Sequence, residues 1–167
     1  MTQWPNHPMT SGFLLGKFLP PHRGHLYLIE VAQKQVDHLT VLVCSLEREP
    51  IPGALRYQWL RDLFPGVNIQ HFAEDIPQYP HEHPDFWTLW LNVIRRYVPT
   101  GPDLVFSSEA YGETLAEVLG ARHVCVDLPR ATFPVSGSAV RANPAAYQHW
   151  LPPAVQNYFA ERHWQSV

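Results

Sequence analysis

Lysine is scarce in this sequence, and the sequence has no excess of positive charge. Lysine occurs only at positions 17 and 34 among the 12 basic residues, and the formal net charge is −3. General nucleic-acid binders carry an excess of Lys and Arg that neutralises many phosphates, so this balance argues against that class. It leaves room for a small anionic ligand, because an arginine-rich set favours planar, bidentate recognition of phosphate or carboxylate.

Cysteine pairs and long apolar runs are also lacking. Cys44 and Cys125 lie inside apolar runs, and their spacing fits neither a disulfide framework nor a zinc ribbon, which suits a reducing cytoplasm. No run approaches the roughly 18 consecutive apolar residues of a membrane span, and residues 1–10 lack the basic start and apolar middle of a signal peptide. We therefore expect a cytoplasmic protein with no membrane or nucleic-acid partner.

What is present is an alternation of buried-strand and helix patterns along a chain of 167 residues, the size of one ordinary domain. Residues 1–11 are expected to form a flexible N-terminal arm, and residues 12–167 a single domain. Strands are predicted at 12–18, 38–46, 67–72, 103–108 and 122–128, helices at 24–36, 54–64, 84–97 and 110–120, and a tail in short helical pieces from 136. This order predicts an α/β fold: a parallel five-stranded sheet with helices on both faces and a helical C-terminal tail.

Ligands of such sheets bind beyond the carboxyl ends of the strands, so the loop after the first strand is the first candidate. It reads "GKFLPPHRGH", and it is neither a G-x-x-x-x-G-K-S/T loop nor a G-x-G-x-x-G turn. Gly24 and the following amides open a helix, whose N-terminus favours anions, and His22 and His25 can donate hydrogen bonds to phosphate oxygens. Two unrelated histidines, or a metal pair without a third ligand, are the alternatives.

Two motifs carry a resemblance to a known superfamily. "GKFLPPHRGH" is similar to the G-x-F-x-P-x-H-x-G-H signature of the HIGH-type nucleotidyltransferases, and "VSGSAVR", residues 135–141, resembles their I-S-x-T-x-x-R motif. Ser138 stands where many members have threonine, a change that keeps the hydroxyl. The resemblance implies a Rossmann-like nucleotidyltransferase fold and transfer of a nucleoside monophosphate from ATP or CTP.

Within that superfamily the chain most resembles the nicotinamide-mononucleotide (NMN) adenylyltransferase domain of the NadR type. The likeness runs from about residue 12 to 160 and includes "LRYQWL", "HPDFW", "SSE", "VDLPRATF" and "VSGSAVRANP". The helix-turn-helix and the ribosylnicotinamide kinase of bifunctional members are not expected in this chain. The implied reaction joins NMN to the α-phosphorus of ATP, releases pyrophosphate and forms NAD. Mg²⁺ is implied with ATP, held by phosphate oxygens and water rather than by a protein cage.

The resemblance also assigns catalytic residues. His25 would contact the transferring α-phosphate beside His22, Lys17 would neutralise charge shared with the incoming phosphate, and Arg141 would add a delocalised charge. The implied ATP-binding set is Gly16, Phe18, His22, Gly24, His25, Ser136, Gly137, Ser138 and Arg141. The alternatives are a solvated helix arginine for Arg141 and plain helix caps for the serines.

The NMN side of the site is less specific in sequence. Its implied residues are Lys17, Arg56, Trp87, Asp127 and Arg130. Trp87 could stack on the cationic nicotinamide ring, or lie on the buried side of an amphipathic helix. Arg56 could reach a phosphate or lie on a helix surface, and Asp127 with Arg130 could bind ligand or brace their loop. "HEH" at 81–83 is expected to be an exposed loop rather than a metal site.

Two other functions stay open at this point. One is adenylyl transfer to another acceptor, such as nicotinate mononucleotide or phosphopantetheine, because the ATP half of the site is common to these enzymes. The other is a non-catalytic nucleotide-sensing module that keeps the fold. The resemblance is also compatible with a homo-oligomer.

Overall fold

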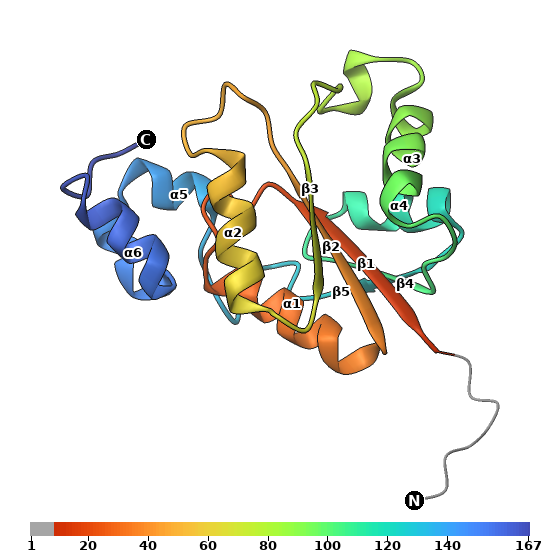
Figure 1. The fold of residues 1–167 in the computed structure, drawn as a ribbon, viewed down its shortest axis with the longest axis horizontal. Coiled ribbons are helices and arrows are strands. Elements are labelled where there is room, and N and C mark those ends of the chain that lie inside the picture. Colours follow the sequence, from red (N-terminus) through yellow and green to blue (C-terminus); the bar gives the residue numbers. More distant parts are fainter. Residues whose placement is uncertain (1–8) are drawn as a thin grey trace, which may run out of the picture.

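A five-stranded, fully parallel sheet forms the centre of the computed structural model, which describes residues 9–167. The strand order is β3-β2-β1-β4-β5 (Figure 1). The strands are β1 (Ser11–Gly16), β2 (His38–Cys44), β3 (Asn68–Phe72), β4 (Leu104–Ser107) and β5 (Arg122–Cys125). The predicted fold class is confirmed, and a strand is present at each of the five predicted places, with ends that differ from the predicted ones by up to three residues. Residues 1–8 of the expected arm lie outside the described residues, and Ser11 already belongs to β1.

The helices follow the strands in the predicted order. They are α1 (Arg23–Gln35), α2 (Gly53–Leu63), the 3₁₀ turn η1 (Pro80–Glu82), α3 (Phe86–Tyr97) and α4 (Tyr111–Leu119). The tail forms α5 (Gly137–Ala142), the 3₁₀ segment η2 (Pro144–Trp150) and α6 (Pro153–Ala160). No helix within residues 9–167 combines the length and apolar character needed to cross a membrane.

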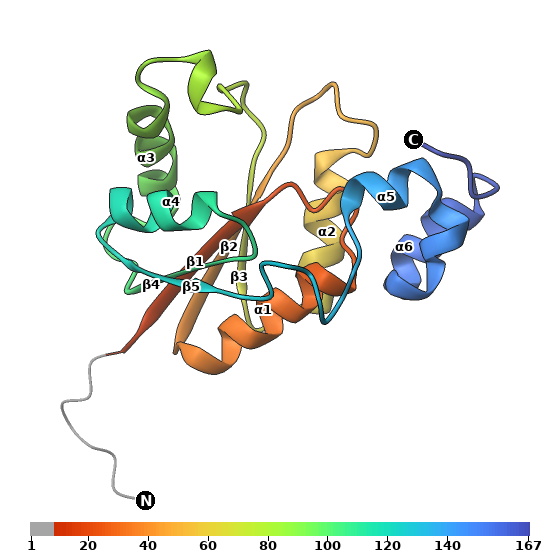
Figure 2. The ribbon, with the colours of Figure 1, turned by 180° about the vertical axis from the view of Figure 1, so that it is seen from behind.

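Two apolar clusters cover the two faces of the sheet, because successive strand residues point to opposite sides. Leu14 of β1 packs with Ile29 of α1 and Leu60 of α2 on one face. Phe13, its neighbour in sequence, packs with Ile94 of α3 and Leu115 of α4 on the other. Both views of the ribbon show the two helix pairs on opposite sides of the sheet (Figures 1 and 2).

The chain changes direction across the sheet at β1, and this positions the site. It first adds β2 and β3 on one side of β1 and then crosses to add β4 and β5 on the other. A crevice forms at such a switch point, outside the carboxyl ends of the strands. A third apolar cluster, which includes Leu19, Trp59, Val140 and Phe159, packs the tail against the loop after β1 and against α2. The motif of α5 is thereby brought next to the motif that follows β1.

Candidate functional site

A cavity of about 610 Å³ lies at the carboxyl end of β1. Its wall combines the loop after β1, the start of α1, one side of α3, the residues after β4 and β5, and the start of α5. The predicted site residues that line it are Gly16, Lys17, Phe18, His22, Gly24, His25, Trp87, Asp127, Arg130, Ser136, Gly137, Ser138 and Arg141. The two motifs, more than a hundred residues apart in sequence, therefore meet in one cavity.

The two histidines form the N-terminal cap of α1. The His22 ring accepts a hydrogen bond at Nδ1 from the Gly24 amide (3.1 Å), and the His25 ring accepts one at Nδ1 from the His22 amide (3.2 Å). The rings stack with centroids 3.7 Å apart. Because each Nδ1 accepts, the proton of each neutral ring lies on Nε2, which becomes a donor. Nε2 of His22 is buried and has no hydrogen-bond partner among the described residues.

Both imidazoles are held neutral. Burial, together with the positive charge of Arg130, lowers the pKa of His22 to about 3. Burial also lowers the pKa of His25 well below its usual value, with His22 and Arg130 acting in the same direction. At neutral pH the pair therefore offers two N–H donors without positive charge, which can bind phosphate oxygens without giving up a proton.

Close approach explains two of the motif glycines. A Cβ at Gly24 would lie 3.0 Å from the His22 ring, and a Cβ at Gly137 would lie 2.7 Å from the carbonyl oxygen of Leu19. Both positions bring backbone to the cavity wall where a side chain would displace a neighbour. Phe18 adopts a positive φ of 49° and places its ring edge against His25, with centroids 4.9 Å apart.

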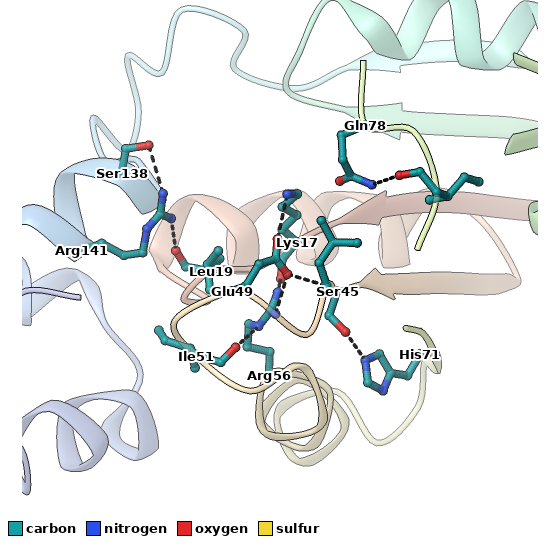
Figure 3. Close-up of polar contacts among 12 residues, drawn as sticks. Lys17, Leu19, Ser45, Glu49, Ile51, Arg56, His71, Gln78, Ser138 and Arg141 are labelled. Carbon is teal, nitrogen blue, oxygen red and sulfur yellow. Dashed lines mark hydrogen bonds and ion pairs between the residues drawn. The ribbon is translucent and has the colours of Figure 1, made fainter. Parts of the chain in front are cut away.

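The second motif joins the first through Arg141. The guanidinium donates from Nη1 to the Leu19 carbonyl (2.6 Å) and from Nη2 to the Ser138 hydroxyl (3.5 Å) (Figure 3). Ser136 is the N-cap of α5 and accepts from the Ala139 amide (3.1 Å). The alternative of a plain cap thus holds for the Ser136 hydroxyl, although Ser136 also lines the cavity. Arg141 is half-buried and tethered, not a solvated helix arginine.

Arg56 is placed differently from its predicted role. Its side chain is fully buried, and the cavity wall does not include it. Its guanidinium donates to the carbonyls of Ile51 (3.0 Å) and Lys17 (2.7 Å) and forms an ion pair with Glu49 (2.8 Å) (Figure 3). A prediction that Arg56 contacts the NMN phosphate is therefore corrected, because its donors are used to hold the loops behind the cavity. The alternative of a helix-surface arginine is wrong as well.

Asp127 and Arg130 brace the loop after β5. The Asp127 carboxylate accepts from the amides of Ala131 (2.8 Å) and Thr132 (3.1 Å). Arg130 donates to the Val135 carbonyl (3.1 Å). The bracing alternative therefore describes the contacts seen for this pair, and both residues have positive φ, as expected of a tight turn. Both also line the cavity, and Arg130 brings positive charge close to the histidines.

The other end of the cavity is aromatic. Trp87 is half-buried and lines it, with its ring at the edge of Phe86 (5.0 Å). Trp90 is buried and donates from its indole nitrogen to the Pro77 carbonyl (2.9 Å). Tyr111 also lines the cavity and donates to the Leu15 carbonyl (3.2 Å). Trp87 thus has the exposure needed for a stacking platform, whereas Trp90 has a structural role.

Several lining residues were not predicted from the sequence. They include Gln78, Tyr79, Phe86, Ser108, Glu109 and Tyr111. Tyr79 is 61% exposed at the rim, and a sequence signal for it was available in the proline-rich loop 73–83 that precedes α3. Tyr111 and Glu109 follow β4, an edge position that the switch-point rule could have selected.

The cavity holds neither an activated nucleophile nor a metal cage. Cys44 lines it, but burial raises the pKa of that thiol to about 12, so it stays protonated. Within residues 9–167 no group of three or more His, Cys, Asp or Glu side chains is arranged to hold a metal ion. His81 and Glu82 are exposed, as expected, but they belong to the 3₁₀ turn η1, and His83 is half-buried and accepts from the Asp85 amide (3.0 Å). The arrangement can therefore bind and orient anions and stabilise charge that develops on them.

Comparison with known proteins shows the family to which the chain belongs. A protein-family model described as cytidylyltransferase-like matches residues 13–143. The chain belongs to the cytidylyltransferase-like family. The matched range includes both motif segments that meet at the cavity, residues 16–25 and 135–141.

Two curated relatives of this family member have names that state their functions. The chain is 32% identical to the trifunctional NAD biosynthesis/regulator protein NadR of Escherichia coli (strain K12), over 94% of this chain and 42% of the relative. It is 21% identical to the nicotinamide-nucleotide adenylyltransferase of Methanococcus maripaludis (strain C5 / ATCC BAA-1333), over 89% of this chain and 88% of the relative. The chain thus spans less than half the length of the NadR relative.

Solved structures share the fold of this family member. The crystal structure of NadR in complex with NR matches with a TM-score of 0.66 at 21% identity, over 90% of this chain and 45% of that chain. The crystal structure of NadR in complex with NAD and AMP-PNP matches with a TM-score of 0.62 at 20% identity, over 86% and 44%. These matches agree with the Rossmann-like nucleotidyltransferase fold expected from the two motifs.

Proposed function

We propose that this chain transfers the adenylyl group of ATP to nicotinamide mononucleotide, which forms NAD and releases pyrophosphate. The observation that carries the proposal is the composition of one cavity: donors and cations from both motifs at one end, and an aromatic end that contains Trp87. A triphosphate matches the end with the donors and cations, and a nucleotide with a cationic base matches the aromatic end. The functions for which the two curated relatives are named support the same reaction.

The chemistry needs no general base. The attacking group is the phosphate of NMN, which is already an anion at neutral pH, and the leaving group is pyrophosphate. Catalysis then consists of placing two polyanions in line and stabilising charge on the transferring phosphate. The neutral His25 donates to an α-phosphate oxygen, with His22 packed against it, and Lys17 lies where the incoming phosphate meets the α-phosphate.

The remaining motif residues bind the leaving group. Ser136 and Ser138, at the start of α5, and the delocalised charge of Arg141 face the β- and γ-phosphates. The tether from Arg141 to the Leu19 carbonyl holds the second motif at a fixed position relative to the first. Charge that builds on pyrophosphate is stabilised by groups that are in place before reaction.

The acceptor base occupies the aromatic end. An indole face attracts the positive ring of nicotinamide by a cation–π interaction worth about 0.5 to 2 kcal/mol. Trp87 supplies this face. Adenylyl transfer to nicotinate mononucleotide is the competing acceptor chemistry, and Arg130, which also lines the cavity, is the cation that would favour it.

Magnesium is proposed to enter with ATP. The acidic residues in the described cavity wall are Glu109 and Asp127, and the carboxylate of Asp127 is already bonded to its own loop. The donor set of the cavity, made of imidazole, ammonium, guanidinium and hydroxyl groups, therefore suits an ion bound by phosphate oxygens and water. There the ion supplies charge neutralisation of the triphosphate.

The free thiols of Cys44 and Cys125 are consistent with a cytoplasmic site of action.

A direct assay tests the proposal. Purified protein is supplied with ATP, MgCl₂ and one of three acceptors, NMN, nicotinate mononucleotide or phosphopantetheine, and pyrophosphate release is followed with product separation. We expect NAD from NMN, loss of turnover in His25→Ala, and wild-type turnover in His81→Ala, whose exposed imidazole lies outside the cavity. Faster turnover with another acceptor overturns the NMN assignment, and binding of ATP without turnover on any acceptor identifies a nucleotide sensor.

A further inference from the structure

Glu49 holds the ammonium group of Lys17. The Lys17 Nζ lies 2.7 Å from Glu49 Oε2, with the lysine side chain 45% exposed and the glutamate side chain only 7% exposed. Lys17 lines the cavity, whereas Glu49 is not among the residues that line it. Figure 3 shows the Glu49 carboxylate in contact with both Lys17 and Arg56. The ion pair therefore connects a group that reaches substrate to one that does not.

Glu49 is itself fixed from the other side. Its Oε1 accepts from the Leu46 amide (2.7 Å) and from Arg56 (2.8 Å). Arg56 also donates to the carbonyl of Lys17 (2.7 Å), so one buried guanidinium holds both the backbone of Lys17 and the carboxylate that binds its side chain. Burial would raise the pKa of Glu49, but hydrogen bonds from Lys17, the Leu46 amide and Arg56, together with the positive charge of Arg56, lower it below its usual value.

A lysine needs such support more than an arginine does. Its ammonium is a point charge on a flexible four-carbon stem, and the rotamer entropy of that stem opposes fixing it. Of its three N–H donors one is used by Glu49, which leaves two for phosphate oxygens. The charges of Lys17, Glu49 and Arg56 sum to +1, so Glu49 also limits the local positive charge beside the triphosphate.

We infer that Glu49 is a positioning residue that fixes the Lys17 ammonium at the point where the two phosphates meet. The inference rests on the proposed function, since Lys17 contributes to rate only where phosphates react in this cavity. Loss of the Glu49 charge should leave anion binding intact or slightly stronger, while it lowers the rate of the chemical step. A purely structural role would instead change stability and leave the split between kcat and KM unaltered.

The scarcity of lysine allows a test that needs no turnover. Protein labelled with ¹³C only at the lysine methylene next to Nζ has two labelled sites, and Lys34, exposed in the last turn of α1, is an internal reference. We expect the Lys17 methylene next to Nζ to be more restricted than that of Lys34 in the wild type, and to become as mobile as Lys34 in Glu49→Gln. Equal mobility of Lys17 in the wild type and in Glu49→Gln overturns the inference, whatever the enzyme's substrate is.

Kinetics give the second test. We expect Glu49→Gln to lower kcat about tenfold with KM for ATP and NMN unchanged or lower, since misplaced reacting groups reduce rate more than binding. The matched control is Glu30→Gln, which breaks the exposed Arg23–Glu30 pair on α1 away from the cavity. In a Lys17→Met background the Glu49→Gln change should have no further effect on kcat, because a positioning role acts on rate through the Lys17 ammonium.

The outcomes separate the two proposals. A tenfold loss that persists in the Lys17→Met background, or a Glu49→Gln enzyme as fast as the wild type, overturns the positioning role. Faster turnover in Glu49→Gln also overturns it and shows that Glu49 withdraws Lys17 from substrate. Wild-type protein without turnover on any acceptor refutes the proposed function, while the mobility measurement still reports on the ion pair.

Discussion

Replacement of Arg56 by methionine separates its structural role from a role in substrate binding. Methionine keeps most of the length and apolar bulk, but it removes the donors to the carbonyls of Ile51 and Lys17 and the ion pair to Glu49. Arg56 is fully buried and Glu49 nearly so, and loss of one partner of a buried ion pair costs about 3 to 5 kcal/mol. Typical domains have about 5 to 15 kcal/mol of stability, so a large part would be lost.

The assay is urea unfolding followed by circular dichroism, with Arg61→Met as the matched control. Arg61 lies on the same helix but is exposed, so its replacement should change the free energy of unfolding by about 0.5 kcal/mol or less. The reasoning is refuted if Arg56→Met is no more destabilising than Arg61→Met. It is also refuted if Arg56→Lys folds with wild-type stability yet binds NMN at least tenfold more weakly, since that is the behaviour of a phosphate ligand.

Three further changes test other parts of the structure. Gly53→Ala should destabilise the protein by about 1 to 3 kcal/mol, because the new Cβ would lie 2.0 Å from the hydroxyl oxygen of the buried Ser45. Gly66→Ala is the control and should be near neutral in the same unfolding assay, because the nearest atom to its Cβ would be 4.0 Å away. Because the pKa of His22 is lowered in the folded state, the imidazole takes up its proton in the unfolded state at a higher pH than in the folded state. The free energy of unfolding should therefore fall as the pH drops from about 6.5 towards 3, by about 1.4 kcal/mol per pH unit for this group. His22→Asn, which keeps a capping side chain, should make that decline shallower, and an unchanged slope would contradict the assigned pKa. Trp87→Ala should weaken NMN binding about two- to thirtyfold in calorimetric titration and leave ATP binding unchanged, and equal effects on both ligands would argue against stacking.

The sequence predicted the sheet well because its strands are continuous apolar runs separated by helical patterns. The error at β5 has a local cause: the expected strand continued to residue 128, but the strand ends at Cys125 and Asp127 turns away with a φ of 50°. Apolar character alone does not reveal such a turn. The partner strand β4 also ends at Ser107, whose carbonyl accepts the last bond on that side from the Val126 amide (2.8 Å).

Site residues that belong to a motif could be predicted from the sequence. Residues whose role depends on their burial in the folded protein were harder to predict. His22 and His25 were identified because they belong to the first of the two motifs that carry the family resemblance, and they line the same cavity as Arg141 of the second motif. Arg56 was misplaced because an arginine at the start of a helix gives no sign in sequence that it is buried. Glu49 was not singled out at all, since it lies in a loop and acquires its role only through contact with Lys17.

The fate of the α-phosphate tests the central claim most directly. In a single-turnover experiment with Mg²⁺, excess NMN and ATP carrying a labelled α-phosphorus, the products are separated and the label is followed. Adenylyl transfer predicts that the label appears in NAD and that unlabelled pyrophosphate forms in equal amount. Label recovered in ADP or in free AMP, with no label in NAD, would contradict it.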